Sequence, residues 1–233
     1  MINIKLFHFN ELGTCCSVLW KEGNTRCAIV DPGMSDEEEC RQLFGYLEEN
    51  ALDPEGILLT HGHFDHTWGV RALLARKAVP VYLDPADKDL ADLGIRYFYK
   101  KPATPKEPPF PTVDVHGGEV LTVAGIPFQV ISTPGHTPGG VCYYCEEEKL
   151  LLSGDTLFAG SIGRSDFPGG DYDSLIKSIM DRLMGLPGDV DVIPGHGPRT
   201  TIGREAMTNP FLIPFNEPDE GIDWDRDGIT FER

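Results

Sequence analysis

The sequence predicts an α/β fold in which two β-rich halves are each flanked by helices. Three observations support this prediction. Short apolar runs with strand character are followed by one or two helical segments, and this order occurs twice along the chain. Glycine and proline are frequent, at 26 and 19 residues, which predicts many turns and short elements. A length of 233 residues fits one large domain, or one domain with a small appendage, with an ample core.

The first half combines short strands with two helices. Its expected elements are strands at 5–9, 17–21 and 26–31, a helix at 36–50, a strand at 56–60, a helix at 67–78 and a strand at 80–84. Acidic residues crowd the first turn of helix 36–50, as the helix dipole favours. The run GILLT at 56–60 leads directly into a histidine-rich segment.

The second half repeats this style without repeating the sequence. Its expected elements are strands at 119–123, 127–132, 140–145 and 149–154, a helix at 172–186 and a strand at 189–195. Strands are grouped ahead of the helix in both halves. This order favours two β-rich units over a strictly alternating parallel sheet.

Two segments stand apart from these elements. Residues 100–114 contain five prolines, which exclude regular structure and leave either a hinge between domains or a surface loop that crosses the site. Residues 217–233 hold seven acidic residues and two arginines, as expected of a docked or frayed tail. We therefore predict one domain at 1–210 and a short acidic tail at 211–233.

Charge and hydropathy narrow the classes of partner. The chain has 20 lysine and arginine residues against 37 acidic residues, which gives a net charge of −17. This charge repels phosphate backbones, and no run of basic residues offsets it. Nucleic acid is therefore not expected as a partner. No apolar run reaches the ~20 residues of a membrane span. The first 20 residues lack the pattern of a signal peptide, so the expected location is cytoplasmic. Nothing in the sequence indicates an oligomeric state.

The six cysteines predict core thiols rather than a disulfide framework. Cys142 and Cys145 form a C-x-x-C motif, but the motif lies inside an expected strand. Residues three apart in a strand point to opposite faces, which argues against a shared metal or a redox pair.

Five of the seven histidines follow apolar strands in turn-rich segments. The candidate ligands are His61, His63, Asp65, His66, His136, Asp155 and His196. Side chains placed repeatedly where strands end, next to glycine, are positioned to converge at one edge of a sheet. Imidazole and carboxylate suit Zn²⁺, Fe²⁺ or Mn²⁺. Seven ligands exceed the three of a single catalytic zinc, and they suit two divalent metal ions that share one carboxylate.

The ordered motif H-x-H-x-D-H at 61–66, followed by His136, Asp155 and His196, resembles the metallo-β-lactamase-fold hydrolases over about residues 10–210. The segments TPGHTPGG, SGDTLF, GRSDFPGGD, LPGDVDVIPGHGP and TNPFL resemble the glyoxalase II-type subgroup, the hydroxyacylglutathione hydrolases. The resemblance implies an αββα four-layer sandwich with its site at one edge.

The resemblance also implies how the ligands are divided. One metal would be held by His61, His63 and His136, a second by Asp65, His66 and His196, and Asp155 would bridge them. Zinc is the expected metal, and iron and manganese accept the same ligands. Such a pair lowers the pKa of bound water to about 7, and the hydroxide attacks a carbonyl carbon. A thioester suits this chemistry because its leaving thiol, with a pKa of about 8.5–9, needs little acid assistance. Asp65 is also a candidate proton acceptor.

The chain departs from the glutathione-specific enzymes in one respect. Those enzymes have a helical C-terminal extension that helps to hold glutathione, whereas only 37 residues follow His196 here. An anionic thioester would then need local cations. The candidates are Arg164, Arg199 and Arg204, of which Arg164 in GSIGRSD is favoured because it follows Asp155 closely.

Three alternatives remain open. Persulfide dioxygenases resemble the chain at GRSDF and at the histidine motif, and in that reading His61, His136 and Asp155 would hold one iron with open positions for O₂. A second alternative is a metal-binding module without catalysis. Other members of the fold cleave RNA or β-lactams, but the negative charge argues against RNA, and lactamases are exported proteins.

Overall fold

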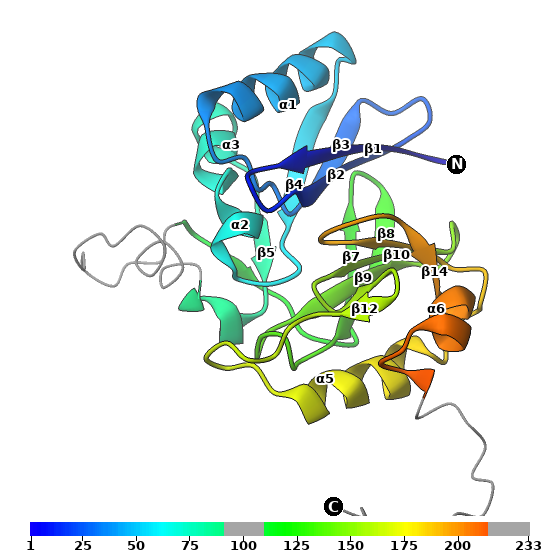
Figure 1. Cartoon of the computed structure of the whole chain (residues 1–233). Coiled ribbons are helices and arrows are strands. Elements are labelled where there is room, and N and C mark those ends of the chain that lie inside the picture. Colours follow the sequence, from blue (N-terminus) through cyan, green and yellow to red (C-terminus); the bar gives the residue numbers. More distant parts are fainter. Residues whose placement is uncertain (91–109, 214–233) are drawn as a thin grey trace, which may run out of the picture.

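Two six-stranded sheets form the centre of the protein (Figure 1). The computed structural model describes residues 1–90 and 110–213. In spatial order the first sheet contains β1 (Ile2–Phe9), β2 (Thr14–Lys21), β3 (Arg26–Val30), β4 (Asp53–Leu58), β5 (Val81–Leu83) and β6 (Val113–Asp114). In spatial order the second contains β14 (Thr200–Thr201), β13 (Asp191–Pro194), β10 (Leu150–Gly154), β9 (Val141–Cys145), β8 (Ile126–Ser132) and β7 (Val120–Val123). A small hairpin pairs β11 (Leu157–Phe158) with β12 (Ser161–Ile162).

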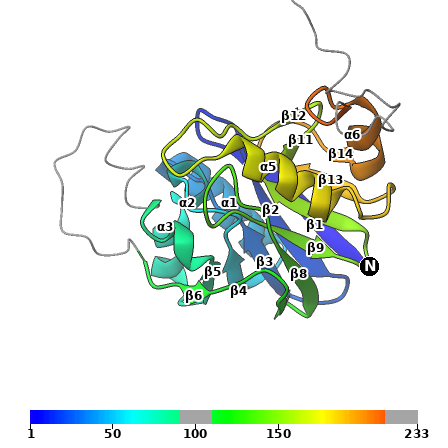
Figure 2. The same cartoon turned by 90° about the horizontal axis from the view of Figure 1, so that it is seen from below.

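Helices cover the outer faces of both sheets (Figures 1 and 2). On the first sheet they are α1 (Glu37–Glu49) and α3 (Val70–Arg76), while the single turn α2 (Phe64–Thr67) follows β4 and the short 3₁₀ helix η1 (Pro85–Asp87) follows β5. On the second they are α5 (Tyr172–Ser178), its π-helical continuation η2 (Ile179–Leu183) and α6 (Ile202–Thr208). Helix α1 begins where predicted because the Asp36 side chain accepts a hydrogen bond from the Glu39 amide.

Three apolar layers hold these elements together. Leu43 and Leu47 of α1 pack on the outer face of the first sheet. Between the sheets, Leu19 and Leu58 of the first sheet lie in one cluster with Phe128 and Leu152 of the second. Leu175 and Ile179 pack with Leu151 on the outer face of the second sheet. The predicted αββα sandwich is therefore confirmed.

Strand direction determines where the loops gather. Strands β3 and β4 are parallel, so the loops that follow them leave the first sheet at the same edge. Strands β10 and β13 are parallel as well, and their following loops leave the second sheet together. The two edges are joined by backbone hydrogen bonds from Cys15 N to Gly195 O (2.7 Å) and from Val141 N to Thr60 O (2.8 Å). Segments distant in sequence therefore meet at one rim.

The structure corrects several of the predicted elements. The helix expected at 67–78 is shorter and forms α3 at Val70–Arg76, because the chain turns at Gly69, whose amide donates to Pro32 O (2.7 Å). The helix expected at 172–186 ends at Leu183 after the π-helical turn. The prolines predicted no regular structure at 100–114, but Val113 and Asp114 form β6, which pairs in parallel with β5. The elements α2, η1, β11, β12, β14 and α6 were not predicted.

The remaining predictions have mixed outcomes. All six cysteines are free, and Cys142 and Cys145 lie in different clusters on opposite faces of the second sheet, as predicted. Within the described ranges, no helix is both long and apolar enough to cross a bilayer. The domain division at 210, most of the segment 100–114 and the acidic tail 217–233 lie at or outside the limits of the described residues and stay predictions.

Candidate metal centre

The first group of predicted site residues lies just beyond β4. His61 follows the strand, His63 is the N-cap residue of α2, and Asp65 and His66 belong to the single turn of that helix. The turn of helix carries Asp65 and His66 toward the rim. His66 is completely buried, and the exposed fraction of Asp65 is only 4%.

The second group comes from three loops of the second sheet. His136 lies between β8 and β9, Asp155 follows β10, and His196 follows β13. Gly195 is needed beside Asp155 because a Cβ atom at this position would overlap Asp155 Oδ1. The backbone therefore approaches the carboxylate more closely than any other residue type would permit.

The seven side chains form two neighbouring sets. In the imidazole set (His61, His63 and His136), His63 Nδ1 lies 3.0 Å from His61 Nε2 and 2.9 Å from His136 Nε2. In the mixed set (Asp65, His66 and His196), Asp65 Oδ2 lies 3.4 Å from His66 Nε2 and 3.3 Å from His196 Nε2. The ligand atoms within each set all lie within 4.8 Å of one another.

Asp155 lies between the two sets. Its Oδ2 is 3.4 Å from His136 Nε2 in the imidazole set and 3.5 Å from His196 Nε2 in the mixed set. Its Oδ1 is buried, has no hydrogen-bond partner and lies 3.4 Å from His66 Nε2, so Asp155 also groups with His61 and His66. An orphaned carboxylate oxygen is costly in a protein interior unless a cation lies beside it. Two observations therefore fit divalent metal ions: the unpaired carboxylate oxygen, and a donor set made of imidazole nitrogens and carboxylate oxygens.

Partners outside the two sets orient the ligands. His66 Nδ1 lies 3.0 Å from Asp31 Oδ2, and Asp31 also accepts hydrogen bonds from the amide and hydroxyl of Thr60. Thr14 donates to Asp65 Oδ2 (2.9 Å). The remaining ring nitrogens face Thr60 Oγ1 for His61 (3.1 Å), Arg164 O for His136 (2.6 Å) and Leu12 O for His196 (3.1 Å). These four histidines thus turn their other nitrogen toward the cluster.

The electrostatics of the two sets differ. Burial, together with the neighbouring imidazoles, lowers the pKa of His61 and lowers that of His63 to about 4. In the mixed set burial also lowers the pKa of each imidazole, but the carboxylates of Asp65 and Asp155 outweigh it and raise the pKa of His66. Hydrogen bonds that His196 donates to the same two carboxylates raise its pKa to about 9. Burial would raise the pKa of Asp65, yet His66 and His196 hold it at about 2.

The predicted arginines differ in their relation to the site. The Arg164 guanidinium pairs with Asp166 through two contacts of 2.7 Å and lies 3.8 Å from the ring centroid of Phe167, whose ring is 5.9 Å from that of His63. Arg199 pairs with Asp191 instead. Arg204 lies exposed on α6. The geometry favours Arg164 among the three.

Sequence reasoning missed four residues around the centre. They are Asp31, Asp87, Phe158 and Phe167. Asp31 carried a usable signal, because an acid directly after an apolar strand belongs at the same edge as the histidines. Phe158, whose ring lies 6.2 Å from that of His196, carried none.

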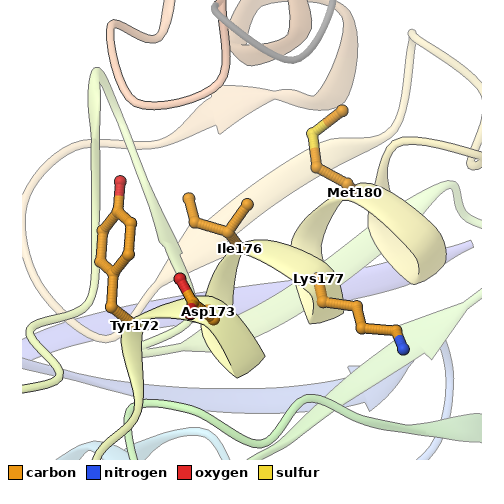
Figure 3. Close-up of a pocket in the computed structure, with 5 residues that line it drawn as sticks. All are labelled: Tyr172, Asp173, Ile176, Lys177 and Met180. Carbon is orange, nitrogen blue, oxygen red and sulfur yellow. The ribbon is translucent and has the colours of Figure 1, made fainter. Parts of the chain in front are cut away.

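A shallow cavity lies apart from this centre, along α5 and the start of η2 (Figure 3). It has a volume of about 400 Å³, and it is lined by Tyr172, Asp173, Ile176, Lys177 and Met180. None of these residues belongs to either ligand set. The cavity therefore has no part in the candidate metal centre.

A rim of clustered imidazoles and carboxylates between two facing sheets marks the class of divalent-metal hydrolases, and sequence comparison specifies the family. The chain belongs to the metallo-β-lactamase superfamily, whose family description matches residues 10–196, a span that contains all seven clustered side chains. The protein is thus a metallo-hydrolase of this superfamily, and the predicted family resemblance is confirmed.

Three relatives illustrate the similarity. Hydroxyacylglutathione hydrolase GloC of Haemophilus influenzae is 36% identical over 91% of this chain and 98% of its own length. The crystal structure of BLEG-1 B3 metallo-β-lactamase is 37% identical, with a TM-score of 0.80 over 91% of this chain and 99% of that chain. The structure of TTHA1623 in a di-iron-bound form is 40% identical, with a TM-score of 0.76 over 89% and 100%.

Proposed function

We propose that the protein is a thioester hydrolase of the glyoxalase II type, acting on 2-hydroxyacyl thioesters with two divalent metal ions. The observation that carries the proposal is the arrangement of seven ligands as two complete sets that share Asp155. A single metal would leave one of these sets, with its buried charges, without a purpose.

The residues would divide between the metals as the geometry groups them. One metal would be held by the imidazole set, the other by the mixed set, and both by Asp155. Zinc is the metal we propose. When bound, such a pair supplies a nucleophile from water at neutral pH and stabilises the negative charge that develops on the substrate oxygen.

The chain's own groups favour a substrate with a good leaving group. With a pKa of about 2, Asp65 is ionised at neutral pH and cannot donate a proton to a departing atom. The same value makes it a weak proton acceptor, so we assign it to metal binding rather than to acid–base catalysis. A thiolate departs without a proton, whereas the nitrogen of an amide or a β-lactam needs one.

The relatives supply independent support. The name of GloC specifies a hydroxyacylglutathione hydrolase, and TTHA1623 binds two irons. BLEG-1 is described as a β-lactamase at comparable identity, so identity alone does not separate thioester from β-lactam. The acid–base argument above is what favours the thioester.

Arg164 is our candidate for contacting an anionic substrate. Its guanidinium lies beside Phe167, close to the imidazole set. Pairing with Asp166 holds the head group in one position. An incoming carboxylate would exchange with Asp166 at little cost, because an exposed ion pair contributes only about 0–1 kcal/mol.

The test combines metal analysis with substrate assays on the purified protein. We expect two metals per chain and release of free thiol from S-lactoylglutathione, with no hydrolysis of a chromogenic β-lactam. One iron per chain, with O₂ consumed in the presence of glutathione persulfide, would replace the proposal with the persulfide dioxygenase. Two metals without turnover of any thioester, ester or lactam would indicate a binding module.

A further inference from the structure

Asp87 is a buried carboxylate that the proposed chemistry does not use. It is the last residue of η1, its exposed fraction is 0%, and it belongs to neither ligand set. Its two oxygens accept three hydrogen bonds. Oδ2 accepts from Gly62 N (2.9 Å) and Thr137 Oγ1 (2.7 Å), and Oδ1 accepts from Gly139 N (2.7 Å).

The three donors belong to the two loops that carry the imidazole set. Gly62 lies between His61 and His63 in the loop after β4. Thr137 and Gly139 follow His136 in the loop between β8 and β9. One side chain therefore joins two loops that come from different sheets.

The backbone of both loops packs closely against Asp87. A Cβ atom at Gly139 would lie 2.8 Å from Asp87 Cγ, and one at Gly62 would overlap the Asp87 carbonyl oxygen. Both loop backbones are thus in direct contact with this residue. The position of the carboxylate sets the separation of the loops, and a change in that separation would move His63 relative to His136.

The chemistry of the donors requires an ionised acid. Two buried amides and a hydroxyl all need acceptors, and a carboxylate has four acceptor sites and no donor. Burial raises the pKa of Asp87, and the bonds from Thr137, Gly62 and Gly139 oppose that shift. An amide in its place would turn a donor toward a buried donor, which costs about 1–3 kcal/mol.

The mixed set is held by other groups. Asp31 contacts His66, Thr14 contacts Asp65, and the Leu12 carbonyl contacts His196. None of the described hydrogen bonds of Asp87 reaches these residues.

We propose that Asp87 is a positioning residue for the imidazole set, which it holds ready for one metal while leaving the mixed set unaffected. This inference rests on the two-metal site of the proposed function. It assigns to Asp87 a role in the affinity of one metal, separate from any general role in folding.

The experiment measures metal stoichiometry and affinity in the full-length holoenzyme carrying Asp87→Asn. After dialysis against a series of chelators of increasing affinity for zinc, we expect about one zinc per chain in the variant where the wild type keeps two. The weaker site should lose roughly 10–100-fold in affinity, as when other outer partners of metal ligands are removed. Cobalt substitution gives a second readout. The absorption bands of cobalt bound by the imidazole set should disappear, while those of cobalt bound by the mixed set should persist.

The matched control is Glu205→Gln. Glu205 is equally buried and accepts hydrogen bonds from Gly160 N, Thr200 Oγ1 and Asn209 Nδ2, none of which adjoins a ligand. It should lower the melting temperature without changing the stoichiometry. Thr137→Val, which removes one donor only, should weaken the same site by a few fold, and it carries the test if Asp87→Asn does not fold.

The outcomes separate this inference from the proposed function. Two metals of unchanged affinity in Asp87→Asn and Thr137→Val, or equal loss of both metals, would overturn the positioning role while leaving the hydrolase intact. A wild-type protein that does not hold two metals would instead overturn the proposed function. Equal effects in Glu205→Gln would show that buried carboxylates act here through folding alone, which also overturns the inference.

Discussion

The imidazole set and the mixed set lie side by side, yet they are built differently. The imidazole set contains no carboxylate of its own, and burial keeps His61 and His63 neutral. The mixed set places Asp65 next to His66 and His196, so its imidazoles bind protons more tightly than usual. A neutral imidazole offers its lone pair to a metal directly, whereas a protonated one must first release a proton.

The partners around the two sets differ in the same way. Asp31 reaches His66 through a side-chain contact with the ring itself. Asp87 reaches the imidazole set only through backbone amides and the Thr137 hydroxyl. Asp31 therefore contacts a ligand ring directly, whereas Asp87 acts on the imidazole set through the backbone and one hydroxyl. The comparison indicates that the two metals would be bound with unequal affinity and unequal dependence on pH.

Removing the residue common to both sets should have the largest effect. Asp155→Asn takes the shared charge from both metals, and we expect loss of both metals together with a fall in kcat/KM of about 10³-fold or more. Elemental analysis and the thioester assay check this result. Asp173→Asn, the same change at an exposed site on α5, is the control. Full activity of Asp155→Asn without metal would disprove metal-dependent catalysis.

Removing one ligand from each set should separate them. His63→Ala should leave one metal in the mixed set, and His196→Ala should leave one in the imidazole set, each with activity reduced by about 10²-fold or more because one metal's share of charge stabilisation is lost. Metal counting and cobalt spectra of the two variants check this. Simultaneous loss of both metals in either variant would show that the sets do not bind independently.

The two single-set variants should respond differently to pH. The pKa of His66 is raised and that of His196 is raised to about 9, so a metal must displace a proton from each ring, and affinity in His63→Ala should rise by more than tenfold per pH unit between pH 7 and 9. In His196→Ala the remaining metal meets His61, whose pKa is lowered, and His63, whose pKa is about 4, so the affinity should depend much less on pH. Titration calorimetry across this range measures both, and parallel slopes would contradict the comparison.

Asp31→Asn should weaken the mixed set most, because Asp31 faces His66 directly and reaches the imidazole set only through Thr60, which lies beside His61. Loss of the carboxylate beside His66 Nδ1 should reduce the affinity of that metal by about 10–100-fold. Chelator competition measures the change, and Asp87→Asn is the reciprocal variant. If both substitutions weaken the same metal, the division of outer partners between the sets is wrong.

The smallest effect is expected at Arg164. Arg164→Ala should raise KM for an anionic thioester by a few fold with kcat nearly unchanged, and should alter stability by no more than about 1 kcal/mol because the pair with Asp166 is exposed. Arg199→Ala, which removes a comparable surface pair, is the control. Equal KM values in both variants would remove Arg164 from the substrate site.

Most of the metal centre could be predicted from the sequence, because its ligands are local signals. Histidine and aspartate directly after apolar strands are readable in a linear chain, and the structure brings all seven predicted side chains together. Asp87 could not be found in this way. Its partners Gly62 and Thr137 lie 25 and 50 positions away, and its own segment carries no metal-ligand pattern.

The sequence by itself determined the two β-rich halves, the family and the types of ligand, because apolar periodicity and ordered motifs are properties of the chain. The tertiary structure alone decided which atoms face which. It paired β3 with β4, and so brought Asp31 to His66, and it paired β10 with β13, and so brought Asp155 to His196. It added the short strands β6 and β14, which exist only because a neighbouring strand offers hydrogen bonds. Local propensity cannot specify such contacts, because their free energy arises only when distant segments are already close.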